Sequence, residues 1–209
     1  MYHVTVKIPG PWGRGWAAGV TALAAAAFLL AGCAPPAYDP TLLQQAAELG
    51  EKEQKWDEAR PMIQEHLLKH PEDPVGHYYY GLSFLHLQFP QLTLAEGELL
   101  TAQGLLERNG DIPAGLLGKD PIVFKGEVYQ KTALVYMRAY YESTRFKVPA
   151  EAQRDLLKKA IAQTETGLKA NPDSVHMKDY HQALMGMLNG MPERTPDIVT
   201  RSGENGAAI

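Results

Sequence analysis

The 209-residue sequence contains a single cysteine, which excludes an intramolecular disulfide, a cysteine-based zinc site and an iron–sulfur cluster. It also lacks an excess of basic residues. The formal net charge is -4 and the pI is about 6.0, so the composition does not favour nucleic acid as a partner. Sustained alternation of polar and apolar residues is missing beyond position 40, which argues against β-strands. With 45% hydrophobic and 21% charged residues, the chain has the composition of a folded domain.

The N-terminal segment has the layout of a secretory signal. A basic region precedes an uncharged, alanine-rich stretch, residues 16–32, which is short for a membrane span of roughly 20 strongly apolar residues. This stretch ends in Leu-Ala-Gly-Cys at positions 30–33, and the motif resembles the lipobox of bacterial lipoproteins. The resemblance implies that signal peptidase II removes residues 1–32 and that Cys33 carries a diacylglycerol on its sulfur and an acyl group on its amine. An uncleaved anchor with an incidental cysteine is the alternative.

The lipid anchor determines the domain organisation and the localisation that we expect. Residues 33–40 form the lipidated cysteine and a proline-rich tether, residues 41–191 form the folded domain, and residues 192–209, which lack apolar periodicity, form a disordered tail. Ala34 follows the cysteine. By resemblance to enterobacterial sorting, this residue implies the outer membrane, with the domain facing the periplasm, or the cell membrane in an organism with a single membrane.

The folded domain shows helical apolar spacing and an internal repeat. Two segments share the same spacing of residues at intervals of four, seven and twelve after an alanine, and each ends in a proline: Ala59, Ile63, His66 and Pro71, and Ala160, Thr164, Gly167 and Pro172. This pattern resembles the second helix of a tetratricopeptide repeat (TPR). The resemblance implies an all-α fold, in which residues 41–191 form a short TPR-like solenoid of antiparallel helix hairpins. A generic helical bundle is the alternative.

The repeat pattern is incomplete in two places. In the expected first helix, Ala47 supplies the small residue of the family, but Gly50 stands where the family has an aromatic residue. In the middle of the domain, the interval between successive matches is close to two repeat periods. The sequence leaves two alternatives there: one repeat with an insertion around residues 141–155, or two degenerate repeats within residues 109–170.

Candidate catalytic groups do not form a recognisable constellation, so we expect a protein that is not an enzyme and has no cofactor apart from the lipid on Cys33. His66 and His70 are four residues apart on a predicted helix and could contact one metal ion. No glutamate follows His66, so the metalloprotease motif His-Glu-x-x-His is absent. The alternative function is an enzyme, or an accessory subunit that binds a small solute or a metal near these histidines. A purely structural spacer is a third possibility.

A concave groove is the expected binding site. By resemblance to the TPR fold, the first helix of each repeat lines this groove, and tyrosine, methionine and arginine are favoured at interfaces. The register of the repeats places seven side chains there: Tyr78, Leu82, Leu85, His86, Leu134, Met137 and Arg138. We therefore expect a membrane-anchored scaffold or assembly factor that binds a segment of another envelope protein. We also expect Tyr78 to contribute to binding and little to stability, as a residue outside the core.

Overall fold

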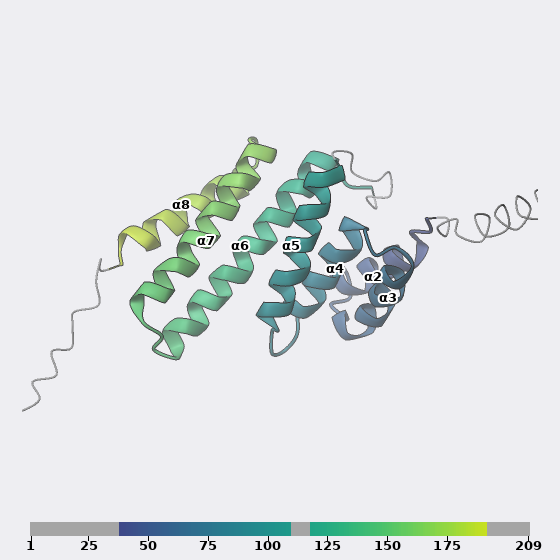
Figure 1. Cartoon of the computed structure of the whole chain (residues 1–209), viewed down its shortest axis with the longest axis horizontal. Helices are drawn as coiled ribbons and strands as arrows, with labels where there is room; N and C mark the ends of the chain where they lie inside the picture. The colour runs from purple at the N-terminus through teal and green to yellow at the C-terminus, as the bar shows by residue number, and fades with distance from the viewer. Residues whose placement is uncertain (1–37, 110–117, 192–209) are drawn as a thin grey trace, which may run out of the picture. The chain divides into compact units, whose positions relative to one another are not determined.

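The computed structural model describes residues 38–109 and 118–191, and all regular secondary structure in these ranges is α-helical. The expected all-α class is therefore confirmed. Signal segment 1–32, Cys33 and tail 192–209 lie outside the described residues. The helices belong to a unit that begins at Asp39, and in chain order (Figure 1) they are α2 (Thr41–Glu51), α3 (Trp56–Lys69), α4 (Pro74–Leu85), α5 (Leu92–Asn109), α6 (Pro121–Arg145), α7 (Ala150–Ala170) and α8 (Val175–Asn189).

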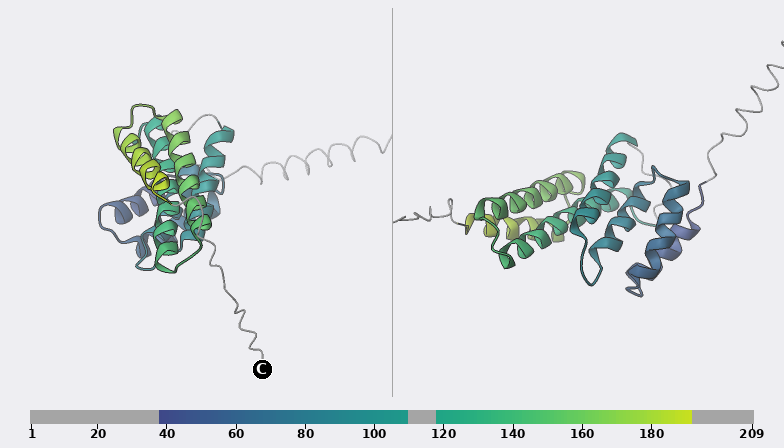
Figure 2. Two further views of the ribbon diagram at one scale, coloured as in Figure 1. Left: turned by 90° about the vertical axis from the view of Figure 1, so that its left-hand side faces the viewer. Right: turned by 60° about the horizontal axis from the view of Figure 1, so that its bottom comes forward.

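Consecutive helices of this unit lie side by side. Each helix packs most extensively against the helices before and after it in the chain, and α4 additionally contacts α2 and α6. Figures 1 and 2 show the pairs α2–α3, α4–α5 and α6–α7 in a row, followed by α8, with the direction of the helices turning gradually along the row. Contacts that are mainly between chain neighbours are what a stack of helix hairpins produces.

Polar side chains fix the first turns of three helices. Asp73 Oδ1 accepts a hydrogen bond from the backbone of α4 at 2.9 Å, and Asp120 Oδ1 accepts two from the backbone of α6 at 2.8 and 3.1 Å. A proline follows each of these aspartates at the first helical position, where its missing N–H costs nothing. Ser174 caps α8 in the same way. These caps explain why the chain leaves its turns at these positions.

Small residues lie where helices cross closely. Ala59 on α3, Ala95 on α5 and Ala160 on α7 are all completely buried. At Gly81 on α4, an added Cβ would lie 2.9 Å from Cγ of Leu99 on α5, which is closer than a real Cβ contact. Ala59 and Ala160, which the repeat pattern aligns, are therefore among the buried small residues of these helices.

The aromatic side chain that is missing at Gly50 comes from another position. The indole of Trp56, the first residue of α3, occupies the space above Gly50, where an added Cβ would lie 2.6 Å from Cζ3 of the ring. Trp56 is 4% exposed. Glycine at position 50 thus allows the side chain at the start of α3 to fill the inside of the α2–α3 turn.

The long interval in the repeat pattern corresponds to one extended hairpin. Residues 118–170 contain two helices, α6 and α7, joined by a short turn. Residues 141–155 make up the end of α6, this turn and the start of α7, so the extra residues lengthen both helices at the tip of the hairpin. Two repeats within residues 109–170 would require four helices, and the described part of that segment does not contain them.

The core consists of two hydrophobic clusters along the row of helices. The first involves α2 to α6, and the second involves α6, α7 and α8. Between them, the buried amide of Gln103 on α5 donates to Thr132 on α6 at 2.7 Å and to Gln163 on α7 at 2.9 Å. This polar link joins three helices and satisfies a group that would otherwise be costly to bury.

Candidate functional site

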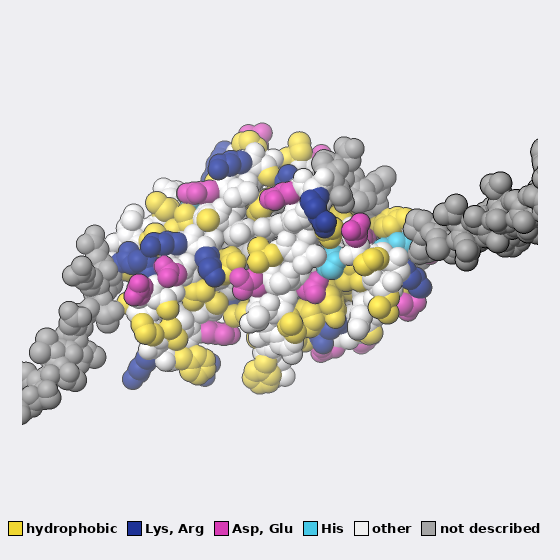
Figure 3. Space-filling view, in the orientation of Figure 1, with side chains coloured by type: hydrophobic (Ala, Val, Ile, Leu, Met, Phe, Trp, Pro, Cys, Tyr) yellow, Lys and Arg dark blue, Asp and Glu magenta, His cyan; other side chains and the backbone are white. Residues whose placement is uncertain are grey.

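A cleft of about 260 Å³ opens between α2, α4 and α6. These helices are the first members of the three hairpins, and the turn before α3 and the residues before α6 complete the walls. The lining combines aromatic, amide and charged side chains: Glu51, Gln54, Trp56, Tyr78, Leu82, His86, Lys119, Glu127, Gln130 and Lys131. On the face of the molecule shown in Figure 3, acidic and basic side chains are interspersed, so this face carries no large patch of one charge.

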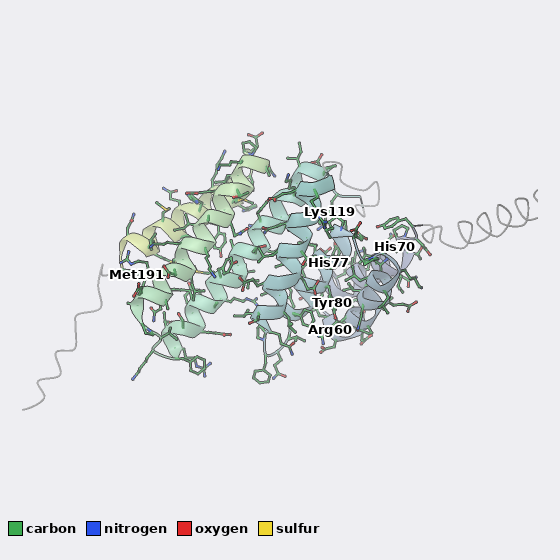
Figure 4. All side chains as sticks on the ribbon, viewed as in Figure 1. Arg60, His70, His77, Tyr80, Lys119 and Met191 are labelled. Carbon is green, nitrogen blue, oxygen red and sulfur yellow. The ribbon has the colours of Figure 1, made fainter. Side chains whose placement is uncertain are left out.

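Lys119 closes one end of the cleft. Its Nζ lies 2.8 Å from Oε2 of Glu127 and 3.3 Å from Oε1 of Glu51, and it lies over the rings of Tyr78 and Tyr79 at 5.7 and 5.8 Å. The side chain of Lys119 is labelled in Figure 4. Burial lowers the pKa of Lys119, but the hydrogen bond to Glu127 and the neighbouring acidic groups raise it by more, so the ammonium stays charged. Lys119 thereby connects the start of α6 to the end of α2.

The opposite wall carries a stacked pair of rings. Trp56 and His86 are nearly parallel, with centroids 5.0 Å apart and an interplanar angle of 11°. Partial burial lowers the pKa of His86, and the positive charges of Arg138 and Lys131 on α6 lower it further. The histidine is thus held near two basic side chains and favours its neutral form.

The backbone at the mouth of the cleft has an unusual conformation. Gln54 has φ 59°, in the left-handed region that non-glycine residues rarely adopt. Its side-chain amide donates to the carbonyl oxygen of Glu51 at 2.9 Å, which stabilises this conformation by closing the last turn of α2. As a result, the chain reverses sharply enough for Trp56 to reach Gly50.

The structure distributes the seven predicted groove residues between the core, the cleft and the surface. Tyr78, Leu82, Leu85 and Met137 are buried, with 1%, 3%, 0% and 7% exposure. Leu134 and Arg138 are half-buried, and His86 is partly exposed beside its stacking contact with Trp56. Of these seven residues, Tyr78, Leu82 and His86 line the cleft, whereas Leu85, Leu134, Met137 and Arg138 are not part of its lining. Arg138 instead donates to the carbonyl oxygen of Leu85 at 2.5 Å.

The expectation that Tyr78 lies outside the core is wrong. Its ring packs edge-on against Tyr79 and Phe124, with a centroid distance of 5.1 Å in each pair. Burial raises the pKa of the Tyr78 hydroxyl well above its usual value, as does the charge of Glu127. The repeat register predicts that this face of α4 is open to the groove, but Lys119 and the first turns of α6 cover it.

Seven residues of the cleft were not predicted from the sequence: Glu51, Gln54, Trp56, Lys119, Glu127, Gln130 and Lys131. Glu51, Glu127, Gln130 and Lys131 lie on α2 and α6, which are first helices, so the same rule of register could have identified them. Lys119 gave no such signal, because it lies outside every helix and reaches the cleft only through the fold.

His66 and His70 are engaged in contacts near the α3–α4 turn. His66 is 2% exposed, and its Nε2 lies 2.7 Å from Oδ2 of Asp73, the residue that caps α4. The ring of His70 lies against that of His66, with centroids 4.9 Å apart. Among residues 38–109 and 118–191, no group of three or more histidine, cysteine, aspartate or glutamate side chains is arranged to hold a metal ion.

Comparisons with protein-family models, with curated proteins and with solved structures found no match to this chain. No helix in the described part of the chain is both long enough and apolar enough to span a membrane.

Proposed function

We propose that this protein is a lipid-anchored, TPR-like scaffold or assembly factor that faces the periplasm and binds a segment of another envelope protein. The observation that carries the proposal is the cleft of about 260 Å³ between α2, α4 and α6. In a TPR-like array the first helices of successive hairpins form the concave face. The cleft lies between these helices, and three of the side chains assigned to the groove by register, Tyr78, Leu82 and His86, line it.

The array itself is supported by the succession of hairpins and by the buried small residues. Ala59, Ala95 and Ala160 are each 0% exposed on the second helices of the three hairpins. Gly81 and Ala133 are buried on the first helices α4 and α6. Together with the final helix α8, this arrangement supports an array of three repeats followed by a helix that covers the end of the last one.

The lining of the cleft suits a polypeptide. Leu82 and Trp56, both almost fully buried, form the apolar part of its wall, while the amides of Gln54 and Gln130 can both donate and accept hydrogen bonds. A segment of main chain carries the same combination of donors and acceptors beside apolar side chains. Pockets of this kind fix the orientation of a ligand with few polar groups.

The anchor is proposed from the sequence alone. Leu-Ala-Gly-Cys at positions 30–33 supports lipidation of Cys33, and Ala34 supports sorting to the outer membrane in an organism with two membranes. At about 0.8 kcal/mol per buried methylene, two or three acyl chains bind the protein to the membrane without help from its mildly acidic domain.

Site-specific photo-crosslinking in the intact envelope tests this function. A photoreactive residue at Gln54 or at Gln130, on two different walls of the cleft, should yield one and the same crosslinked envelope protein. The same residue at Lys178, an exposed position on α8, serves as the control and should not yield it. An equal yield from Lys178, or the absence of an adduct from both glutamines, would exclude the cleft as the binding site.

A further inference from the structure

Two phenylalanine rings project from turns at one edge of the row of helices. Phe89 lies in the α4–α5 turn and Phe146 follows the last residue of α6, and their exposed fractions are 80% and 72%. Both turns lie at the lower edge of Figure 1, and hydrophobic side chains protrude at this edge in Figure 3. We call this side, which carries the turns within the hairpins, the hairpin edge. Single exposed apolar side chains are ordinary, but two almost free aromatic rings on successive hairpins indicate a contact surface.

Hydrogen bonds close the two turns that carry these rings. In the α4–α5 turn, the N–H of Gln91 donates to the carbonyl oxygen of Phe84 at 3.1 Å. In the α6–α7 turn, the N–H of Val148 donates to the carbonyl oxygen of Ser143 at 2.9 Å. The rings are therefore presented by ordered turns, which lowers the entropy that is lost when they bind.

Basic side chains flank one of the two rings. Arg145 and Lys147 are both exposed, and the guanidinium of Arg145 lies 5.9 Å from the centre of the Phe146 ring. Within residues 38–109 and 118–191, neither Arg145 nor Lys147 forms an ion pair, and Glu142 is the single acid of the segment 142–148. This turn therefore carries an excess of one positive charge beside an exposed aromatic ring. Apolar rings beside basic side chains favour the boundary of a bilayer that contains anionic lipid.

The proposed anchor leaves the hairpin edge within reach of the bilayer. At 3.6 Å per residue, the eight residues 33–40 can span at most about 29 Å. Helix α2 has 11 residues, so the α2–α3 turn lies about 16 Å from the end of this tether. Trp56, directly after that turn, stacks on His86 at the end of α4, which places the α2–α3 turn beside the α4–α5 turn. The tether is thus long enough for the hairpin edge to touch the membrane to which Cys33 is attached.

We infer that the hairpin edge lies on the membrane surface, with Phe89 and Phe146 inserted among the lipid headgroups and with Arg145 and Lys147 beside lipid phosphates. This inference rests on the proposed function, because the lipid on Cys33 supplies the attachment and the edge determines how the domain is oriented. A fluid bilayer accepts separate protruding rings, whereas a protein partner requires a continuous, complementary surface. The two rings are on different turns, so the bilayer suits them better.

A fluorescent probe on the full-length, lipidated protein tests this contact. Bimane is attached to a cysteine that replaces Gln88, an exposed residue of the α4–α5 turn. The protein is reconstituted in vesicles of phosphatidylcholine and phosphatidylglycerol that contain a nitroxide-labelled lipid. We expect the bimane emission to shift to shorter wavelength and to be quenched by the nitroxide. The same probe at Glu72, an exposed residue of the α3–α4 turn at the opposite edge, should show neither effect.

Two matched double variants separate the phenylalanines from exposed apolar residues in general. Phe89→Ser with Phe146→Ser should abolish the shift and the quenching at Gln88, while the acyl chains still attach the protein to the vesicles. Leu68→Ser with Val175→Ser is the control, because these side chains are 79% and 65% exposed at the opposite edge, and it should keep both effects. Omission of phosphatidylglycerol, or a higher salt concentration, should weaken the quenching. Thermal melts of both double variants should match the wild type, since the four side chains are exposed.

The outcomes separate this inference from the proposed function. Equal quenching at Gln88 and Glu72, or quenching at Gln88 that persists without both phenylalanines, would overturn the inference and leave the anchor and the cleft as proposed. A photoreactive residue at Gln88 that yields a protein adduct in the intact envelope would also overturn it, since a protein would then cover the hairpin edge. If the processed protein did not bind vesicles at all, the lipid anchor of the proposed function would be contradicted instead.

Discussion

Replacement of Gly50 by alanine should destabilise the protein even though alanine is the better helix former. The added Cβ would lie 2.6, 2.7 and 2.8 Å from three carbon atoms of the Trp56 indole. The indole is rigid and is itself stacked against His86, so the ring or the helix has to move. Overpacking of this kind costs about 1–3 kcal/mol, whereas the gain in helix propensity from glycine to alanine is about 1 kcal/mol. The expected net loss is about 1 kcal/mol, measured as a lower midpoint of denaturant unfolding.

Gly97→Ala is the control for this prediction. Gly97 lies within α5, and an added Cβ at this position meets no atom within 4 Å. The substitution should stabilise the protein by up to about 1 kcal/mol, through helix propensity alone. If Gly50→Ala stabilised the protein as Gly97→Ala does, the reasoning that Trp56 occupies the space above Gly50 would be refuted.

Three further predictions concern a core residue, a histidine and the anchor. Tyr78→Ala should lower the free energy of unfolding by about 3–5 kcal/mol, because the ring is 1% exposed, and an unchanged denaturant midpoint would contradict its place in the core. Burial lowers the pKa of His77, but hydrogen bonds to Glu98 at 2.6 Å and to the Pro71 carbonyl at 2.9 Å raise it by more. The stability contributed by protonated His77 is therefore complete below the unfolded pKa of about 6.5 and is lost as the pH rises through the higher folded pKa. Denaturant midpoints of wild type and His77→Gln, measured across this range, should therefore converge at high pH. Cys33→Ser should leave an unprocessed precursor without acyl mass on its N-terminal peptide, and normal processing in this variant would exclude the lipoprotein assignment.

The helices and their close contacts could be predicted because they depend on local patterns. Helical apolar spacing and the internal repeat predicted the all-α class, and the aligned alanines Ala59 and Ala160 are both completely buried. The Asp-Pro pairs before α4 and α6 act as caps through residues that are adjacent in the sequence. Such features need no knowledge of distant contacts.

The walls of the cleft depend on contacts that the sequence does not reveal. The repeat register placed Tyr78 on the open face of α4, but Phe124 and Lys119 from the start of α6 cover it. No pattern in a single sequence shows that these residues reach α4. Likewise, the sequence pattern lacks an aromatic residue at Gly50, but the ring of Trp56, at the start of the next helix, occupies the space there. In both cases the side chain that decides the outcome belongs to another helix or turn.

The most direct test of the account is the affinity of the crosslinked partner for a protein whose cleft is filled. The partner captured through Gln130 is purified, and its dissociation constant is measured with wild type, with Gln130→Trp and with Lys178→Trp as the surface control. We predict that Gln130→Trp weakens binding at least about tenfold, a loss of about 1.4 kcal/mol, while Lys178→Trp binds as the wild type does. Equal affinity of all three proteins would contradict the claim that this cleft binds the partner.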